Sequence, residues 1–133
     1  MANPELRAVA PPLEDCRFGD LVITAHESGG VIRVDWNGKS NDRQPGKVLD
    51  PWFGRAVSRA LDSHASIEMH FEGLEFFNSS TITSIIQLIQ DVREKGIKLV
   101  IVFNAQLKWQ KLSFDALRIF EKADGLLQLR SVG

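Results

Sequence analysis

The chain has 133 residues, of which 44% are hydrophobic and 25% are charged, and its formal net charge is −1. This length and composition are typical of one globular domain with a sizeable core. The nearly neutral charge argues against a nucleic-acid-binding protein, which normally carries a basic face. We expect no membrane insertion, because no apolar run approaches the roughly 20 residues that a spanning helix needs. The N-terminus lacks the apolar segment of a signal peptide, and the single cysteine, Cys16, agrees with a reducing cytoplasm.

The N-terminal part of the chain predicts an arm followed by a hairpin. Residues 1–19 are rich in proline and charge, so we expect a flexible arm ahead of a single domain at residues 20–133. Residues 20–28 and 30–38 alternate like strands, and Gly29-Gly30 between them is a hairpin signal. A polar loop is expected at residues 39–47.

The first helix is predicted to begin at Asp50-Pro51, with the aspartate as N-cap and the proline in the first helical position. Its apolar residues recur at helical spacing: Phe53, Ala56, Val57, Ala60 and Leu61. Residues 66–77 are expected to be extended, with an interruption at Gly73.

The second half of the chain alternates between helices and strands. A second helix is expected to start near Ser79 or Ser80 and to end at Lys95-Gly96, a cation followed by a C-cap residue. Residues 97–104 form a continuous apolar run, which is typical of a strand buried on both faces. A third helix through residues 109–124 and a last strand at residues 126–132 complete the chain. The order β-β-α-β-α-β-α-β predicts a mixed α/β sheet with helices packed on it.

The segment "EFFNSSTITSIIQLIQ" (residues 75–90) places three hydroxyl residues at the turn between a strand and the second helix. Asn78 or Ser79 can cap this helix, which leaves neighbouring hydroxyls exposed beside backbone N–H groups that lack intrahelical partners. A phosphate added there would meet hydrogen-bond donors, so the helix would tolerate it. Helix capping alone would select the same residue types.

This arrangement resembles a stand-alone STAS domain, the fold of sulfate transporters and anti-sigma-factor antagonists. That family carries an Asp-Ser-(Ser/Thr)-Gly signature at the start of its second helix, and the matching residues here are Asn78-Ser79-Ser80-Thr81. The family's phosphoacceptor follows the aspartate, so the resemblance implies Ser79, supported by Asn78, with Ser80 and Thr81 as alternative acceptors. The chain departs from the signature at Asn78 and at Thr81.

The pieces "NGKSNDRQPGKVLDPWF" and "FFNSS" are similar to bacterial regulatory phosphoproteins that control a diguanylate cyclase in biofilm formation. This second resemblance implies a cytoplasmic signal-transduction protein that works by partner switching and is not an enzyme. Its unmodified form would bind an effector such as a diguanylate cyclase or an anti-sigma factor. A histidine-kinase-like Ser/Thr kinase would release the effector by phosphorylating Ser79, and a metal-dependent Ser/Thr phosphatase would reverse the modification.

We expect the partner to contact the start of the second helix and the loop at residues 39–50. The residues assigned to this surface are Ser40, Asn41, Asp50, Trp52, Asn78, Ser80 and Thr83. Trp36, Trp52 and Trp109 are either partner anchors, since aromatic residues concentrate in interface hot spots, or packing residues of the domain.

Motifs for catalysis, metals and cofactors are absent from the sequence. His26, His64 and His70 share no metal-ligand spacing, and no Gly-x-Ser-x-Gly elbow surrounds Ser79 or Ser80. The glycine-rich phosphate loops of nucleotide-binding proteins are also missing. We therefore expect no catalytic residue, metal or cofactor. Two alternatives stay open: a constitutive STAS scaffold or oligomerisation module whose serines only cap a helix, and a small enzyme that uses Ser79 or Ser80.

Overall fold

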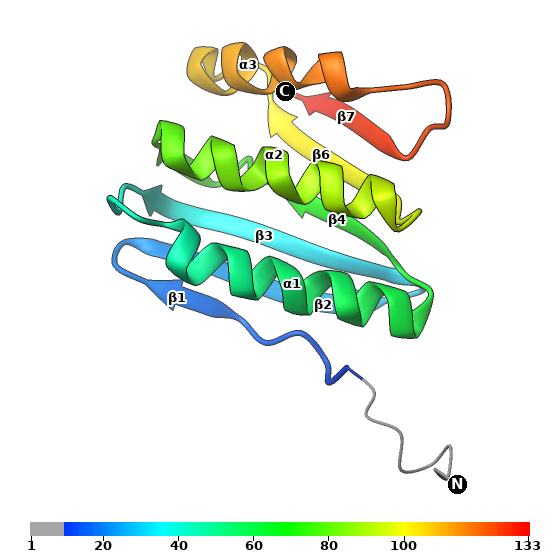
Figure 1. The fold of residues 1–133 in the computed structure, drawn as a ribbon. Coiled ribbons are helices and arrows are strands. Elements are labelled where there is room, and N and C mark those ends of the chain that lie inside the picture. Colours follow the sequence, from blue (N-terminus) through cyan, green and yellow to red (C-terminus); the bar gives the residue numbers. More distant parts are fainter. Residues whose placement is uncertain (1–9) are drawn as a thin grey trace, which may run out of the picture.

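The structure is a computed structural model that describes residues 10–133 (Figure 1). The strands are β1 (Cys16–Phe18), β2 (Leu21–Ser28), β3 (Val31–Ser40), β4 (Ser66–His70), β5 (Leu74–Phe77), β6 (Leu99–Asn104) and β7 (Leu127–Val132). The helices are α1 (Gly46–Ser63), α2 (Ser79–Glu94) and α3 (Lys108–Asp115), and α3 continues into the 3₁₀ helix η2 (Ala116–Phe120).

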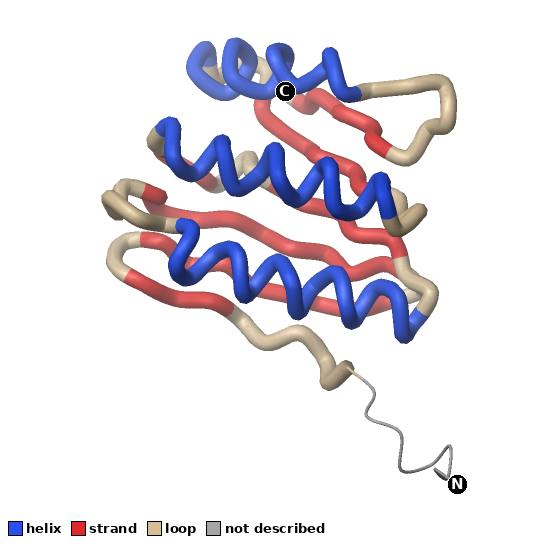
Figure 2. Tube along the Cα trace, viewed as in Figure 1, coloured by secondary structure: helices blue, strands red, loops and turns tan. Residues whose placement is uncertain are grey.

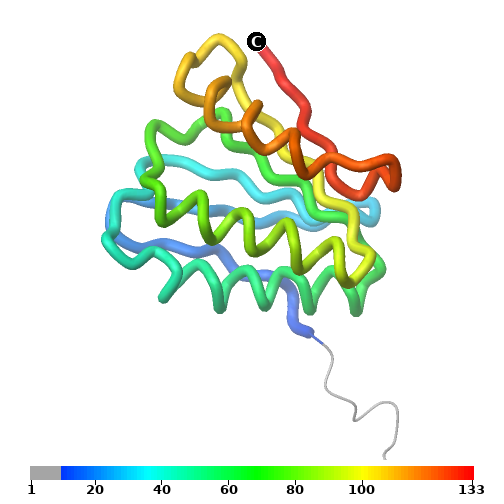
Figure 3. Tube along the Cα trace, turned by 45° about the horizontal axis from the view of Figure 1, so that its top comes forward, coloured from blue at the N-terminus to red at the C-terminus, as the bar shows by residue number. Residues whose placement is uncertain are grey.

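All seven strands belong to one mixed sheet, and the helices lie over one of its faces. The strand order is β1-β2-β3-β4-β6-β7, and β5 pairs with the end of β3. β1, β2 and β3 are antiparallel, whereas β3, β4, β6 and β7 run parallel. Figures 2 and 3 show α1, α2 and α3 on the same side of this sheet. The predicted α/β class, a mixed sheet with helices packed on it, is confirmed.

The β2–β3 hairpin is confirmed at Gly29-Gly30. Both glycines have positive φ, 57° and 78°, and they connect the paired residues Ser28 and Val31. A two-residue turn of this kind needs left-handed backbone at both positions, which glycine adopts without a steric cost. The turn therefore sets the register of the sheet's antiparallel edge.

The core lies between the sheet and the helices. Side chains of β6 illustrate it: Leu99, Ile101 and Phe103 pack in the core cluster, while Val100 and Val102 are buried on the opposite face. The prediction of a strand buried on both faces is confirmed. The largest fully buried side chains are Trp36, Trp52, Phe71, Phe103 and Phe114.

The start of α1 differs from the prediction, because the helix begins at Gly46 and not at Asp50. The carbonyl of Pro45 accepts the backbone N–H groups of Val48 and Leu49, at 3.1 and 2.8 Å, and so starts the helix one turn earlier. Pro51 then lies inside the helix. As the sixth residue of the helix, Pro51 has no N–H to donate to the Lys47 carbonyl, and the helix nevertheless continues to Ser63.

Two other helical predictions also need correction. Leu61, assigned to the apolar stripe of α1, is 42% exposed, so the stripe ends at Ala60. The third helix is α-helical only to Asp115 and 3₁₀-helical to Phe120, and it stops short of residue 124.

The N-terminal segment contributes to the domain. Residues 1–9 of the predicted arm lie outside the described residues, but Cys16–Phe18 form β1 and pair with Leu21–Ile23. The indole N–H of Trp52 on α1 donates to the Glu14 carbonyl at 2.8 Å, and the Cys16 side chain is buried. The expectation of a flexible arm is therefore wrong for residues 16–18, because backbone pairing and burial hold them against the sheet.

Candidate functional site

The turn between β5 and α2 has the geometry expected of a capped helix start. Asn78 is the N-cap, with extended backbone (φ −91°, ψ 174°), and its side-chain oxygen accepts the backbone N–H of Thr81 at 2.9 Å. Ser79 is the first helical residue. Of the two capping residues that the sequence allows, Asn78 takes the role, so neither serine is needed for it.

The three hydroxyl residues that follow Asn78 have different environments. Ser79 and Ser80 are exposed, and neither hydroxyl forms a hydrogen bond with any residue from 10 to 133. The hydroxyl of Thr83 donates to the backbone carbonyl of Ser79. Thr81 is fully buried, and its hydroxyl donates to the Asn78 side-chain oxygen at 2.8 Å. A kinase could reach either serine, but the alternative acceptor Thr81 is excluded by its burial.

A chain of hydrogen bonds ties the start of α2 to the end of β3. Because the Thr81 hydroxyl donates to Asn78, the Ser40 hydroxyl is the donor in its 2.6 Å contact with Thr81. The backbone N–H of Asn78 donates to the Ser40 carbonyl at 3.0 Å. The side-chain NH₂ of Asn78 donates to the Asp42 carbonyl at 2.6 Å. The cap therefore also holds the loop that follows β3.

The amide of Asn78 makes two kinds of hydrogen bond that an aspartate at this position could not both make. One side-chain atom accepts hydrogen bonds from Thr81, and the other donates to the Asp42 carbonyl. An ionised aspartate can only accept, so it would place a carboxylate oxygen against that carbonyl. In this chain the asparagine is the residue that satisfies both neighbours.

A shallow groove separates the start of α1 from the start of α2. Among its lining residues are Arg43, Lys47, Asp50, Ser80, Thr83 and Gln87. The two helices approach closely here, since a Cβ on Gly46 would lie 3.4 Å from the Ser84 hydroxyl. Asp50, Ser80 and Thr83, assigned from the sequence to the partner surface, thus lie around one groove. Asn41 is exposed in the neighbouring loop.

Two of the residues assigned to the partner surface are buried. Ser40 is 1% exposed and belongs to the hydrogen-bond chain under the cap. Trp52 is also 1% exposed, packs against Phe53 and donates to a backbone carbonyl. Neither side chain can contact a partner, so both assignments are corrected. Trp36 is a core residue as well, and Trp109 packs edge-on against Phe77, with ring centroids 5.2 Å apart.

Several residues of this region were not singled out from the sequence. Arg43 and Lys47 bring positive charge to the groove, and they form no ion pair within the described part of the chain. Phe76, two residues before the cap, is 45% exposed although it lies in a strand. The repeated phenylalanines of "EFF" were a signal for this site, since an aromatic side chain beside exposed serines suits a protein interface.

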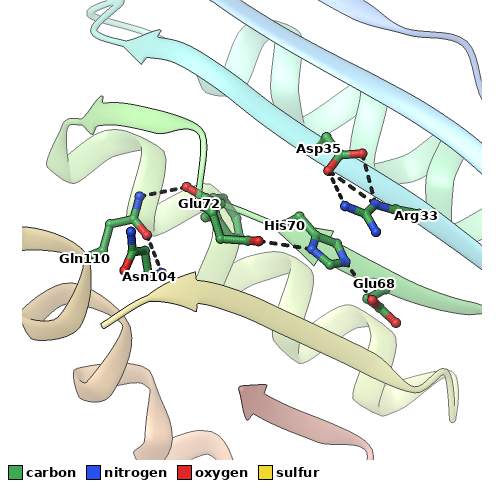
Figure 4. Close-up of polar contacts among 8 residues, drawn as sticks. Arg33, Asp35, Glu68, His70, Glu72, Asn104 and Gln110 are labelled. Carbon is green, nitrogen blue, oxygen red and sulfur yellow. Dashed lines mark hydrogen bonds and ion pairs between the residues drawn. The ribbon is translucent and has the colours of Figure 1, made fainter. Parts of the chain in front are cut away.

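The buried amide of Gln110 supports the same edge of the sheet (Figure 4). Its NH₂ group donates to the carbonyls of Phe71 and Leu74 at 2.7 and 3.0 Å, and its oxygen accepts the backbone N–H of Asn104 at 2.8 Å. One side chain of α3 thereby joins the β4–β5 turn to the end of β6. No sequence signal indicates this role, because the turn lies more than 35 residues away along the chain.

A second polar cluster lies on the sheet face that carries no helix. The ring of His70 contacts Glu72 at 3.0 Å and Glu68 at 2.6 Å, and the Arg33–Asp35 ion pair lies beside it on β3 (Figure 4). Across residues 10–133, no three His, Cys, Asp or Glu side chains are placed to hold a metal ion. His70 is partly buried, and it lies on a different face of the sheet from the groove.

No protein-family model matches the chain, and no curated protein matches it. Over the described range, every helix is too short or too polar to cross a membrane. Any function must therefore be argued from the geometry at the start of α2.

Proposed function

We propose that this protein is a phosphorylation-controlled, STAS-like regulator that binds a partner in its unmodified form and releases it when Ser79 is phosphorylated. The observation that carries the proposal is the division of roles at the start of α2. Asn78 forms the cap, and Ser79 is exposed with a hydroxyl that forms no hydrogen bond to any residue between 10 and 133. A phosphate on Ser79 would therefore leave the cap intact.

The helix start favours the modified form of Ser79. The first backbone N–H groups of α2 have no intrahelical acceptor and carry partial positive charge. A phosphate adds about −1.5 to −2 units of charge at neutral pH, and at a helix N-terminus it meets donors. Phosphorylation is then expected to change the surface charge without unfolding α2.

The partner would bind across the groove and the adjacent loop. The residues proposed for contact are the exposed ones: Asn41, Asp50, Ser80 and Thr83, together with Arg43 and Lys47. A phosphate on Ser79, the residue before Ser80 of the groove, would add negative charge to this surface and would repel a partner that approaches with negative charge. The complex would dissociate for electrostatic reasons.

The kinase, the phosphatase and the effector are proposed from the family resemblance. The kinase would be a histidine-kinase-like Ser/Thr kinase, and a metal-dependent Ser/Thr phosphatase would restore the binding form. The effector would be a diguanylate cyclase or an anti-sigma factor, and the cycle would take place in the cytoplasm. The protein itself would act by binding, without catalysis.

Phosphosite mapping and binding measurements test the proposal together. The chain is co-expressed with a histidine-kinase-like Ser/Thr kinase, and the modified residue is located by mass spectrometry. Binding to the protein that co-purifies is then compared for wild type, Ser79→Ala and Ser79→Asp, with Ser80→Ala as the matched control. We expect Ser79→Ala to bind under all conditions, Ser79→Asp to bind weakly and Ser80→Ala to behave as wild type.

A different outcome would favour a scaffold. If the wild type and both Ser79 variants bind equally and no phosphate maps to Ser79, the serines serve the helix start only. The chain would then be a constitutive binding or oligomerisation module.

A further inference from the structure

β7 forms one edge of the sheet. It is the last strand in the order and pairs only with β6 among the described residues, and Figure 1 shows it at the opposite end of the sheet from β1. The carbonyls of Leu126 and Val132 accept backbone N–H groups from the β6 side, at 2.7 and 2.8 Å. Backbone groups alternate between the two sides of a strand, so those of Leu129, an odd number of residues from both, point away from β6. An edge of this kind can pair with a further strand.

Two side chains from the end of η2 occupy the free backbone groups of Leu129. The Glu121 carboxylate accepts the Leu129 N–H at 3.1 Å, and the Arg118 guanidinium donates to the Leu129 carbonyl at 3.3 Å. The two side chains also form an ion pair with each other at 3.3 Å. Arg118 and Glu121, which we call the edge cap, therefore supply the donor and the acceptor that a neighbouring strand would supply.

The edge cap is held in place by contacts of its own. The Arg118 side chain donates through Nε to Asp115 at 3.0 Å, and its guanidinium lies 5.8 Å from the ring centre of Phe103. Both side chains of the cap nevertheless remain at the surface, 40% and 32% exposed, and ion pairs exposed to this degree add little to stability. The main consequence of the edge cap is therefore that the outward backbone groups of Leu129 are occupied.

We propose that the edge cap closes β7 to strand addition, and that without it β7 pairs antiparallel with β7 of a second copy. Between residues 10 and 133, no side chain forms a hydrogen bond with the backbone of Leu127 or Ser131, the other outward-facing positions of β7. Leu129 is the middle one of these three positions. A cap there interrupts the whole edge, because an added strand has to pair at successive outward positions.

The sequence of β7 fits pairing with itself. An antiparallel contact about a two-fold axis at Leu129 sets Leu127 opposite Ser131, so all three outward-facing positions find a partner. The same axis sets Gln128 opposite Arg130, and no like charges lie directly opposite each other. This edge is separate from the groove beside the start of α2, and the proposal does not rest on the partner-switching function.

Glu121→Ala tests the edge cap, and Glu121→Gln is its matched control. Both substitutions remove the same charge, but glutamine keeps a side-chain oxygen that can accept the Leu129 N–H. Sedimentation velocity of the full chain compares both variants with the wild type from about 10 µM to about 1 mM. We expect the association constant of Glu121→Ala to exceed that of the wild type by about tenfold or more, because a paired edge adds several backbone hydrogen bonds. Its mass should rise from 14.9 kDa toward twice that value, and Glu121→Gln should behave as wild type.

Ser131→Pro, added to Glu121→Ala, shows whether the association uses this edge. The Ser131 N–H points away from β6, so proline removes no hydrogen bond to β6 but obstructs an added strand. The double variant should return to wild-type association. Ser131→Ala in the same background keeps the N–H and should leave the association unchanged.

Two further measurements complete the test. The Leu129 amide should exchange faster in Glu121→Ala than in Glu121→Gln at a concentration where both are monomeric, and far-UV circular dichroism confirms that each variant is folded. Arg118→Met removes the donor to the Leu129 carbonyl and should also associate more than the wild type. The proposal is overturned if Glu121→Ala and Arg118→Met both sediment as wild type at every concentration, or if the association persists in the double variant with Ser131→Pro.

Discussion

Replacement of Asn78 by aspartate tests the logic of the helix cap. In the wild type, the side-chain oxygen of Asn78 accepts the N–H and the hydroxyl of Thr81, and the side-chain nitrogen donates to the Asp42 carbonyl at 2.6 Å. Asn78→Asp keeps both acceptor contacts. It removes the donor and places a carboxylate oxygen against a carbonyl oxygen.

The expected loss can be worked from these contacts. The hydrogen bond to the Asp42 carbonyl is exposed to water, so its loss costs about 0.5–1.5 kcal/mol and not the larger penalty of a buried unsatisfied group. A negative charge at a helix N-terminus returns about 0.3–1 kcal/mol. We therefore expect Asn78→Asp to lower the free energy of unfolding by at most about 1 kcal/mol and to be less stable than Ser79→Asp by about 0.5–1.5 kcal/mol, although aspartate is as good an N-cap as asparagine in general.

Ser79→Asp is the matched control, because it adds the same charge one residue later without meeting the Asp42 carbonyl. Its unfolding free energy should equal that of the wild type or exceed it by about 0.3–1 kcal/mol. Urea denaturation followed by circular dichroism measures both variants. Amide exchange supplies a local readout, since residues 41–45 should exchange faster in Asn78→Asp only. Equal stability of Asn78→Asp and Ser79→Asp would refute the assigned role of the amide nitrogen.

Two further substitutions test the packing that supports the site. Ile85→Ala should destabilise the fold by about 2–5 kcal/mol, since Ile85 is fully buried, whereas Ile86→Ala should cost less because Ile86 is only partly buried. Chemical denaturation measures the free energy of unfolding of both variants. Equal losses would contradict the assigned faces of α2. Gln110→Leu should cost at least about 2 kcal/mol, because it leaves the Leu74 carbonyl and the N–H of Asn104 without a partner and removes one of the two hydrogen bonds to the Phe71 carbonyl. A thermal scan that shows no loss for Gln110→Leu would mean that water replaces the amide.

Local chemistry determined several elements from the sequence alone. The β2–β3 turn follows from Gly29-Gly30, because left-handed backbone at two successive positions is a property of those residues themselves. The start of α2 at Ser79 follows in the same way, since a helix cap involves only neighbouring residues. The burial of β6 could also be predicted from the sequence, because an unbroken apolar run has no polar face to expose.

Burial of the polar and aromatic site residues was decided by contacts between distant segments. Ser40 and Thr81 are 41 residues apart in sequence, yet their hydroxyls meet under the cap, which removes both from the accessible surface. Trp52 is covered partly by the segment around Glu14, which the sequence predicted as a flexible arm. The local sequence shows which residues have the chemistry to bind a partner or to be phosphorylated. Only the packing of β3, α1 and α2 decides which of them solvent, a kinase or a partner can reach, because accessibility depends on elements that the local sequence does not contain.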